Sequence, residues 1–428
     1  MTETRVDDIL QTAAAARRSA PPPGDPRYAD YCGELADRLR KDWDQVLAVN
    51  AADLATARER GLGDALLDRL TLSRRHLDQL VALAGDVRHR LSGITAEPDR
   101  RPLAGGGHAR RIPKPLGTVL MIYEARPTVT VEGALLPVAV GNVAILRGGS
   151  EVAATNAALG AVAAAAAAAA GLPAGMVQVL ADGDRRLVRE LLRRHDGIDV
   201  LIPRGSPSLV DYCRTASRIP VIASGGGANH LYVDAGADLA LAARIAVDSK
   251  LAEPTACNTL ELVLVHRDVA AEFTRTLLAL TDALAEPCLL RLDPALAGPH
   301  DGPTRIATLT GDDDGREFLD RSLGVRPVAG VEEAITHIGW YGSGHTEAVA
   351  AADPAVVERF LGAVDAAALV VNGSLRLHDG PTMGLGPELS ISTGRLQVRG
   401  PVGPAALLTY SWVIEGEGAL RGRTGADR

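Results

Sequence analysis

A single cysteine stands in a small polar loop, where a thiol can react. Cys257 belongs to the stretch EPTACNTLELVL (253–264), between the end of a predicted helix and an apolar run that predicts a strand. A structural cysteine more often lies among aliphatic side chains, where it packs as a small hydrophobe. Because its neighbours are Ala256, Asn258 and Thr259, we interpret Cys257 as a candidate nucleophile. A structural thiol remains the alternative.

Two short segments that combine glycine with a basic residue follow predicted strands. One follows the run NVAIL and the other follows VLIP, and together they contain Arg147, Gly148, Gly149, Arg204, Gly205 and Ser206. Ser206 can cap a helix that begins at Pro207, and a helix N-terminus offers N–H groups and a positive dipole end to an anion. Ligands of open α/β sheets bind beyond the carboxyl ends of the strands, so these positions are typical of a dinucleotide site. An ordinary turn and an ordinary cap remain the alternatives, and the sequence has no GxGxxG fingerprint.

Three consecutive glycines follow the strand-like run PVIA. Gly225, Gly226 and Gly227 come after Ser224 and lead into the next predicted strand at His230. Glycine lets the backbone pass close to a bound group, because it has no Cβ atom. A loop that contacts a ligand is one interpretation, and a plain hinge between domains is the other.

Composition and charge restrict the class of protein. The chain has 428 residues, 46% of them hydrophobic, and a formal net charge of −8. Such a chain predicts about two or three globular domains, and its acidic balance argues against nucleic acid and anionic membranes as partners. The N-terminus shows no secretory pattern, so we expect a cytoplasmic protein with a small-molecule partner. The four cysteines are widely scattered, which argues against a disulfide framework and predicts no metal site.

The first hundred residues show helical patterns with capping signals. Asp25 with Pro26, Asn50 and Ser73 each precede an amphipathic run, and each predicts the start of a helix. Helices are therefore expected to begin the chain.

The rest of the chain alternates between short apolar runs and helical segments. One such series begins at Gly117 and a second near Asn229. Strands that alternate with helices predict an α/β fold, with parallel sheets covered on both faces. After Gly394 the pattern indicates extended chain, a candidate edge or subunit-pairing segment.

Six segments resemble those of a known family. They are IYEARPTVTVE (122–132), GNVAILRGG (141–149), VLIPRG (200–205), PTACNT (254–259), VNGSLRLHDG (371–380) and MGLGPELSIST (383–393). With GLGDALLDRLTLS (61–73), they are similar to the γ-glutamyl phosphate reductases, also called glutamate-5-semialdehyde dehydrogenases, of the aldehyde dehydrogenase superfamily. The similarity runs in collinear order from about residue 40 to the end of the chain.

This resemblance implies an aldehyde dehydrogenase-like α/β fold with a doubly wound cofactor domain, an α/β catalytic domain and a small oligomerisation element. The expected NADP-binding domain comprises residues 1–105 and 118–229, and the expected catalytic domain comprises residues 230–372. The oligomerisation element is expected at 106–117 and 390–428, and 373–389 is the expected return segment to the cofactor domain. A homodimer or homotetramer is the expected assembly.

The resemblance also implies a reaction at Cys257. The thiolate displaces phosphate from γ-glutamyl phosphate, and NADPH reduces the thioester to glutamate 5-semialdehyde, a step of proline biosynthesis. The Cys257 N–H is the expected donor to the negative oxygen, and Asn258 is the second catalytic residue that the family motif implies. Ala223 stands where hydrolysing aldehyde dehydrogenases carry a glutamate, so a reductase is expected.

The family motifs likewise imply which residues bind cofactor and substrate. The expected cofactor residues are Arg147, Gly148, Gly149, Arg204, Gly205, Ser206, Gly225, Gly226 and Glu388. The expected substrate residues are Glu124, Arg126, Thr128, Glu253 and His345.

Several residues depart from the family pattern near these sites. The departures are Thr128, Ser150, Ser206, Ala223, Ser224 and Glu253. Glu253 stands four residues before Cys257, where the family usually has an arginine. A glutamate there is expected to repel an anionic substrate. The alternative is that Glu253 points to solvent or pairs with a cation such as Lys250.

Three functions agree with these residues. The first is the reductase of proline biosynthesis, acting on a small acyl phosphate or semialdehyde and functionally coupled to a glutamate kinase. The second is a related reductase of another acyl phosphate or acyl thioester in a specialised pathway. The third is a catalytically silent binding or scaffold homologue, which the retention of Cys257 disfavours.

Overall fold

The computed structural model describes residues 2–96, 100–103, 106–181, 183–416 and 418–419. The chain forms two compact units. The first contains Met1–Ile222, Gly386–Ser390 and Val402–Arg428, and the second contains Ala223–Leu385 and Ile391–Pro401.

These boundaries differ by several residues from those that the sequence predicts. The first unit ends at Ile222, whereas the sequence places the boundary at 229–230. Residues 391–401 belong to the second unit, although the sequence places them in the oligomerisation element. The reason is local, since Thr393 N–H donates to the carbonyl oxygen of Ala223.

Four helices begin the first unit: α1 (Thr2–Ser19), α2 (Pro26–Glu59), α3 (Asp64–Leu70) and α4 (Arg74–Ile94). The predicted caps of α2 and α4 are confirmed. The Asp25 carboxylate accepts from Arg27 N–H, and Ser73 N–H donates to His76 Nδ1 at 3.0 Å. The local capping signals in the sequence therefore predict both helix starts correctly.

The predicted helix start at Asn50 is wrong, because α2 continues through this residue. Asn50 is buried, and its amide forms hydrogen bonds with the end of α3 and the residues after it. It donates to the carbonyl oxygen of Leu70 at 3.0 Å and accepts from Leu72 N–H at 2.9 Å. The asparagine therefore fixes the link between α3 and α4.

A four-stranded parallel sheet forms the centre of the first unit, in the order β5-β4-β3-β6. Its strands are β3 (Thr118–Tyr123), β4 (Val143–Arg147), β5 (Val177–Val179) and β6 (Val200–Arg204). The helices after these strands are α5 (Thr128–Val138), α6 (Ala153–Ala169), α7 (Arg185–Leu191) and α8 (Pro207–Ala216). The central strand β3 is buried over its whole length, as expected for a sheet covered on both faces. The predicted α/β class is confirmed.

One segment in the described part of the chain, Ser150–Ala169, has the length and hydropathy that a membrane span requires. It contains the short helix η1 (Ser150–Val152) and the alanine-rich helix α6. Half of it is buried, and α6 packs against α2, α5 and β5. In this structure α6 is a core helix of the first unit.

A seven-stranded parallel sheet forms the centre of the second unit, in the order β10-β9-β11-β8-β7-β12-β13. Its strands are β7 (Asn229–Val233), β8 (Leu260–His266), β9 (Leu289–Leu292), β10 (Arg305–Thr308), β11 (Ser322–Val328), β12 (Thr346–Ala350) and β13 (Ala368–Val371). Its principal helices are α9 (Leu239–Leu251), α10 (Ala270–Asp282), α11 (Val331–Tyr341) and α12 (Pro354–Ala363). Leu231 and Val263 pack in one apolar cluster, and Tyr232 and Leu264 pack in another. Successive residues of one strand face opposite sides, so both faces of the sheet are covered.

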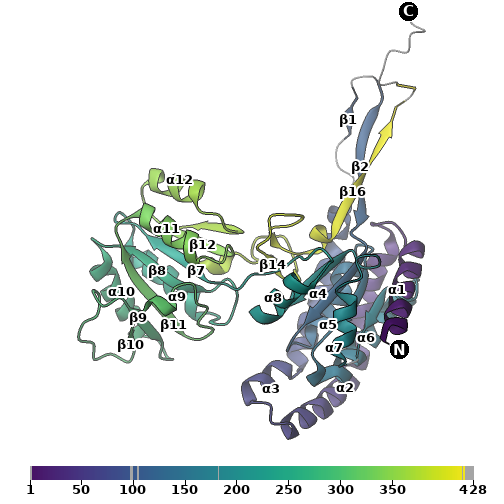
Figure 1. Ribbon diagram of the computed structural model, residues 1–428, viewed down its shortest axis with the longest axis horizontal. Helices are drawn as coiled ribbons and strands as arrows, with labels where there is room; N and C mark the ends of the chain where they lie inside the picture. Colours follow the sequence, from purple (N-terminus) through teal and green to yellow (C-terminus); the bar gives the residue numbers. More distant parts are fainter. Residues whose placement is uncertain (1, 97–99, 104–105, 182, 417, 420–428) are drawn as a thin grey trace, which may run out of the picture. The chain divides into compact units, whose positions relative to one another are not determined.

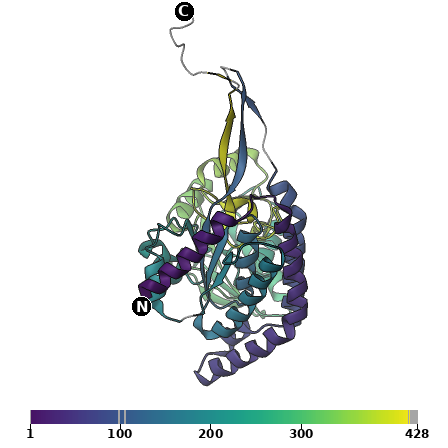
Figure 2. The same cartoon turned by 90° about the vertical axis from the view of Figure 1, so that its right-hand side faces the viewer.

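A long antiparallel arm belongs to the first unit and projects from its helices (Figure 1, Figure 2). Strand β2 (His108–Pro115) pairs with β1 (Arg101–Pro102) on one side and with β16 (Leu408–Glu415) on the other. The predicted extended tail thus becomes strand β16, after the short pair β14 (Ile391–Ser392) and β15 (Gly400–Pro401) and the turn η4 (Pro404–Leu407). Tyr410, Trp412 and Ile414 are exposed along β16.

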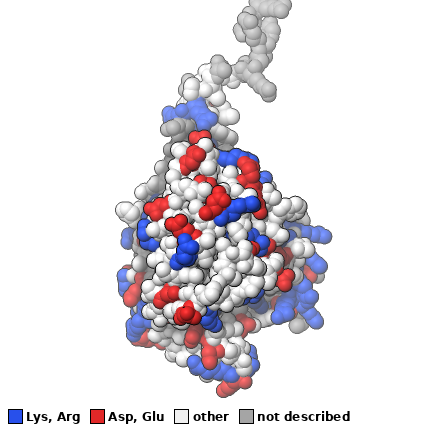
Figure 3. All heavy atoms as spheres, turned by 90° about the vertical axis from the view of Figure 1, so that its left-hand side faces the viewer, with Lys and Arg blue, Asp and Glu red and all other residues white. Residues whose placement is uncertain are grey.

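Acidic and basic side chains lie interspersed on the face shown in Figure 3. Exposed ion pairs of the second unit illustrate this pattern, such as Arg359 with Glu332 on α12 and α11. A surface of mixed sign agrees with a small-molecule partner better than with a polyanion.

Candidate active site

Three neighbouring strands of the second sheet begin at the candidate active site. Strands β8, β7 and β12 lie side by side and run parallel, so their amino ends share one edge of the sheet. Cys257 comes shortly before β8, Asn229 begins β7, and His345 comes directly before β12. The candidate catalytic residues therefore lie at the amino ends of strands.

The backbone around Cys257 is fixed by the Asn229 side chain. Cys257 is half-buried, in the turn between α9 and β8. The Asn229 amide donates to the carbonyl oxygens of Cys257 and Thr259, each at 2.8 Å. Its Oδ1 accepts from Thr346 N–H at 3.1 Å. The sequence prediction missed Asn229, whose sole signal is its place at a strand start directly after the glycine loop.

Gly227 packs directly on the cysteine turn. A Cβ atom at this position would overlap the carbonyl oxygen of Cys257, so the approach of the two backbones requires glycine. Gly227 N–H donates to Glu317 Oε1 at 2.5 Å, and Gly226 lies beside the same carboxylate. The glycine loop therefore has a role within the second unit, and the cofactor role of Gly225 and Gly226 stays a prediction.

One arginine links Asn258 to Glu253. Arg376, in the short helix η3 (Leu375–Leu377), donates through Nη1 to Asn258 Oδ1 and through Nη2 to Glu253 Oε2, the latter at 2.6 Å. Asn258 is buried and donates to the carbonyl oxygen of His378 at 2.9 Å. Both ends of the Asn258 amide are thereby fixed. Arg376 was missed in the sequence, although it lies within the family segment VNGSLRLHDG.

The alternative expectation for Glu253, that it points to solvent or pairs with a cation, is confirmed, but the cation is Arg376 and not Lys250. Lys250 is buried and pairs with Glu261 at 2.7 Å, because a charge inside the unit needs a partner that is also inside. Glu253 is more than half exposed and pairs with Arg376. Its negative charge is therefore compensated, which weakens the expected repulsion of an anionic substrate.

Two buried imidazoles lie behind the cysteine turn. His345 Nδ1 and His378 Nδ1 are 2.7 and 2.8 Å from the hydroxyl of Thr346. Burial lowers the pKa of His345 to about 3 and the pKa of His378 to about 4, so both rings are neutral at neutral pH. His345 is fully buried. Hydrogen bonds through Thr346 and His378 link it to Asn258.

The cofactor candidates of the first unit lie at the carboxyl ends of adjacent strands. Strands β4, β3 and β6 are neighbours; β4 ends at Arg147, β6 ends at Arg204, and Glu124 follows β3. Ser206 caps α8, as the sequence predicts, by accepting from Leu209 N–H. Ligands of parallel sheets collect at this edge.

The N-terminus of α8 already holds a carboxylate. Glu124 Oε2 accepts from Ser206 N–H at 2.8 Å, and a Cβ atom at Gly205 would meet the same carboxylate. Arg204 pairs with Glu132 of α5 at 2.5 Å. This end of the sheet therefore combines donors suited to an oxyanion with acidic side chains that occupy them.

Arg147 retains an unused donor. Its Nη1 donates to the carbonyl oxygen of Gly148 at 2.9 Å. Its Nε is buried and has no hydrogen-bond partner among the described residues. Gly148 packs against Asn156 and Tyr123, so a side chain there would clash. A phosphate oxygen would satisfy the Arg147 donor, and the residues present therefore fit a phosphate-bearing cofactor.

The remaining candidates divide between the two units. Gly149, Arg126, Thr128 and Glu388 lie in the first unit. Arg126 is exposed in the loop after β3, Thr128 begins α5, and Glu388 is half-buried in Gly386–Ser390. The substrate candidates Glu124, Arg126 and Thr128 thus belong to the first unit, whereas Glu253 and His345 belong to the second.

Comparisons with known sequences place the chain in a family. A profile described as the aldehyde dehydrogenase family matches residues 1–287. The chain is 41% identical over 424 residues to a γ-glutamyl phosphate reductase of Sorangium cellulosum, which covers 96% of this chain and 97% of that protein. It is 42% identical over 397 residues to one of Escherichia fergusonii, with 91% and 93% covered.

Solved structures agree with these relatives. The crystal structure of γ-glutamyl phosphate reductase from Thermotoga maritima matches with a TM-score of 0.90 and 30% identity, over 98% of this chain and 100% of that chain. An acetylating aldehyde dehydrogenase from Geobacillus thermoglucosidasius shares the fold, with a TM-score of 0.70, 19% identity and 97% of each chain covered. The chain therefore belongs to the aldehyde dehydrogenase family and, within it, to the γ-glutamyl phosphate reductase group.

Proposed function

We propose that this protein reduces γ-glutamyl phosphate to glutamate 5-semialdehyde with NADPH, through a thioester on Cys257. The observation that carries the proposal is the cysteine turn itself. A half-buried thiol lies in a backbone turn that Asn229 fixes and that Gly227 packs against. Relatives named for this substrate, at 41% and 42% identity over most of the chain, support the choice of substrate.

The first chemical step is an acyl transfer to sulfur. The Cys257 thiolate attacks the acyl carbon, a C–S bond forms, and phosphate leaves with the electrons of the C–O bond. The oxygen of the tetrahedral intermediate needs preorganised donors. The Cys257 N–H is one, and the second N–H of the Asn258 amide is the other, because its first N–H already bonds the carbonyl oxygen of His378.

The cofactor contributes the reducing step. When bound, NADPH supplies the hydride that reduces the thioester carbonyl. Arg147 would hold the 2′-phosphate, since its buried Nε lacks a partner in the described part of the structure. The N-terminus of α8 would hold the pyrophosphate, in place of the Glu124 carboxylate that it now binds. Gly149, Gly225, Gly226 and Glu388 complete the proposed cofactor contacts.

Hydrolysis of the thioester is not expected to compete with its reduction. Ala223 is buried and offers no base to activate water. A thioester that resists water persists long enough to accept the hydride, so a reductase is favoured over an acid-forming dehydrogenase.

The reverse reaction gives a direct test. Purified protein is mixed with glutamate 5-semialdehyde, phosphate and NADP⁺, and absorbance of the reduced cofactor is followed. The proposal expects turnover that requires phosphate and that Cys257→Ser abolishes. Turnover without phosphate would identify a hydrolysing dehydrogenase, and no turnover on this or on other semialdehydes would favour a silent homologue.

The arm and the reaction extend the proposal to assembly and location. We infer a homodimer or homotetramer in which the arm pairs subunits, since β16 lies at the edge of its sheet and exposes Tyr410, Trp412 and Ile414. Acyl phosphates are short-lived, which supports functional coupling to a glutamate kinase. We also propose a cytoplasmic location, as the sequence predicts.

A further inference from the structure

The Arg376 guanidinium bonds the side chain of the residue that directly follows the proposed nucleophile in sequence. It bonds the side chain of Asn258 through Nη1 and that of Glu253 through Nη2. The Arg376 side chain is 23% exposed and the Glu253 side chain is 55% exposed. One partner of the guanidinium is therefore a buried amide next to Cys257, and the other is a carboxylate that solvent or a ligand can replace.

The position of the Arg376 guanidinium favours contact with the phosphoryl group of the substrate over contact with its α-carboxylate. In an acyl phosphate, a single oxygen separates the phosphorus from the carbon that the thiolate attacks. The α-carboxylate of a glutamyl group lies beyond three more carbons. A cation held by the residue after the nucleophile is therefore placed for the phosphoryl group. Guanidinium also matches phosphate geometry with two parallel N–H···O bonds.

We infer that Arg376 binds the phosphoryl group that leaves during acyl transfer, and that Glu253 competes with phosphate for its Nη2 donor. The inference rests on the proposed acyl phosphate chemistry and assigns its phosphate subsite. Glu253 accepts from Arg376 at 2.6 Å, where a phosphate oxygen would accept instead.

Substitution of Arg376 and substitution of Glu253 should change the affinity for phosphate in opposite directions. Removal of the cation weakens phosphate binding. Removal of the competing carboxylate strengthens it, because the Nη2 donor becomes available. An ion pair with a purely structural role would give both changes the same sign, since either one breaks the same contact.

Inorganic phosphate and iodoacetamide provide the binding test. The rate of Cys257 alkylation is measured by mass spectrometry against phosphate concentration, without cofactor or aldehyde. We expect the half-protective phosphate concentration to rise by about tenfold or more in Arg376→Gln, the loss typical of a charge-assisted bond. We expect it to fall several-fold in Glu253→Gln. Arg359→Gln is the matched control, because it breaks an exposed pair with Glu332 that is also 2.6 Å long.

Kinetics in the phosphorylating direction identify the bound group. Arg376→Gln should raise the KM for phosphate and leave the KM for glutamate 5-semialdehyde within about twofold. Arg376→Lys should restore part of the phosphate affinity, and thermal unfolding of each variant monitors the fold. If the KM for the semialdehyde rises instead, Arg376 binds the α-carboxylate and the assignment is overturned. Equal losses in Arg376→Gln and Glu253→Gln would also overturn it.

Failure of the proposed function has a separate signature. If phosphate protects the wild-type protein from alkylation but the semialdehyde is not turned over in a phosphate-dependent way, the result supports the phosphate subsite and excludes the proposed substrate. If the semialdehyde is turned over but phosphate protects no variant from alkylation, the result excludes the phosphate subsite and supports the proposed reaction.

Discussion

At the scale of single residues, burial separates the four cysteines by reactivity. Burial raises the pKa of Cys32 to about 12 and the pKa of Cys213 to about 11, and it also raises the pKa of Cys288. These thiols stay protonated at neutral pH, and the thiolate is the reactive form. Cys257 is half-buried, whereas the other three are buried, so Cys257 is the most accessible thiol and the candidate nucleophile.

The first prediction follows from this contrast. At about pH 7.5, one equivalent of iodoacetamide should label Cys257 before it labels the buried thiols. Peptide mass spectrometry measures the labelling of each cysteine. Cys257→Ser should lose at least about a thousandfold in kcat, because an alkoxide forms far less readily than a thiolate. Cys213→Ala serves as the control and should keep its turnover. Comparable labelling of all four residues would contradict the assignment.

Arg147 supports a prediction about cofactor choice. Its unused Nε donor should gain a charge-assisted bond to the 2′-phosphate, a contribution of about 1.5–3 kcal/mol. Arg147→Ala should therefore lower kcat/KM for NADPH by about tenfold or more and change the value for NADH little. Equal losses for both cofactors would show that Arg147 does not recognise the phosphate. Because Ser150, three residues after Arg147, adds no second cation, we expect moderate discrimination in the wild type.

At the scale of elements, the cysteine turn depends on one anchor. Asn229→Ala removes the amide donor that bonds the carbonyl oxygens of Cys257 and Thr259, at a cost of about 1 kcal/mol for each hydrogen bond. We expect a lower kcat and slower alkylation of Cys257, because the turn loses its fixed geometry.

A second asparagine provides the control for this prediction. Asn372 bonds both backbone groups of Ala351 at 3.0 Å in the same unit. Asn372→Ala should reduce the thermal midpoint of unfolding as Asn229→Ala does, and leave the alkylation rate of Cys257 unchanged. If both variants slow alkylation equally, the effect of Asn229 is general destabilisation.

Local signals explain which elements the sequence predicts. The caps at Asp25 and Ser206 depend on residues two or three positions away, so the pattern alone identifies them. The alternation of strands and helices is equally local, and it predicts the α/β class. Asn50 carries the same signal as a cap, yet tertiary burial within α2 gives it another role.

Long-range contacts explain what the sequence does not predict. The Asn229 amide reaches a carbonyl 28 residues away, and Arg376 reaches Asn258 across 118 residues. No spacing rule identifies such pairs, because the fold alone brings them together. The true partner of Glu253 was missed for the same reason, and Lys250, three residues away, was the closest candidate in sequence.

At the scale of the whole molecule, two buried imidazoles predict sensitivity to acid. The pKa values of His345 and His378 fall from 6.5 to about 3 and about 4 on folding, mainly through burial, although Asp379 opposes the shift of His378. The unfolded chain therefore binds more protons below pH 6.5, so the stability from these neutral rings is present above that pH and is lost as the pH falls toward 4.

The dependence of the thermal midpoint on pH tests this linkage. The midpoint should fall between about pH 6.5 and 4, and His345→Gln should reduce the slope over this interval whatever its effect at neutral pH. His195→Gln alters an exposed ring and should leave the slope unchanged. Parallel curves for wild type and His345→Gln would exclude a contribution from His345.

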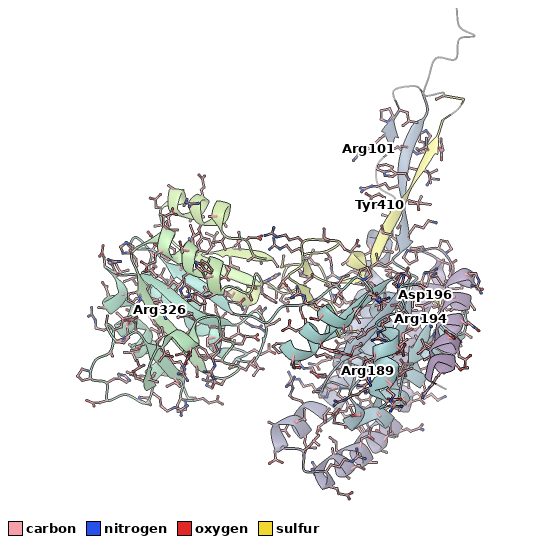
Figure 4. All side chains as sticks on the ribbon, viewed as in Figure 1. Arg101, Arg189, Arg194, Asp196, Arg326 and Tyr410 are labelled. Carbon is pink, nitrogen blue, oxygen red and sulfur yellow. The ribbon has the colours of Figure 1, made fainter. Side chains whose placement is uncertain are left out.

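The exposed aromatic residues of the arm lead to a prediction about how an added negative charge affects assembly. Arg111 lies 4.7 Å from the Tyr410 ring centroid and 5.8 Å from that of Trp412, and Figure 4 labels Tyr410 on this arm. If the arm pairs subunits, Trp412→Glu should bury an uncompensated charge in the interface and lower the mass measured by sedimentation. Leu396→Glu, at an 88% exposed site outside the arm, is the control. An unchanged mass for Trp412→Glu would exclude the arm as the interface.

The path of the chain between its two units limits how the protein can be re-engineered. The chain passes from one unit to the other after Ile222, Leu385, Ser390 and Pro401. A chimaera that takes its first unit from a relative must therefore transplant three separate pieces and preserve four junctions. Shuffling by a single crossover leaves one half incomplete wherever the crossover falls inside these limits. A change of cofactor preference is better sought by substitution at Arg147 than by exchange of modules.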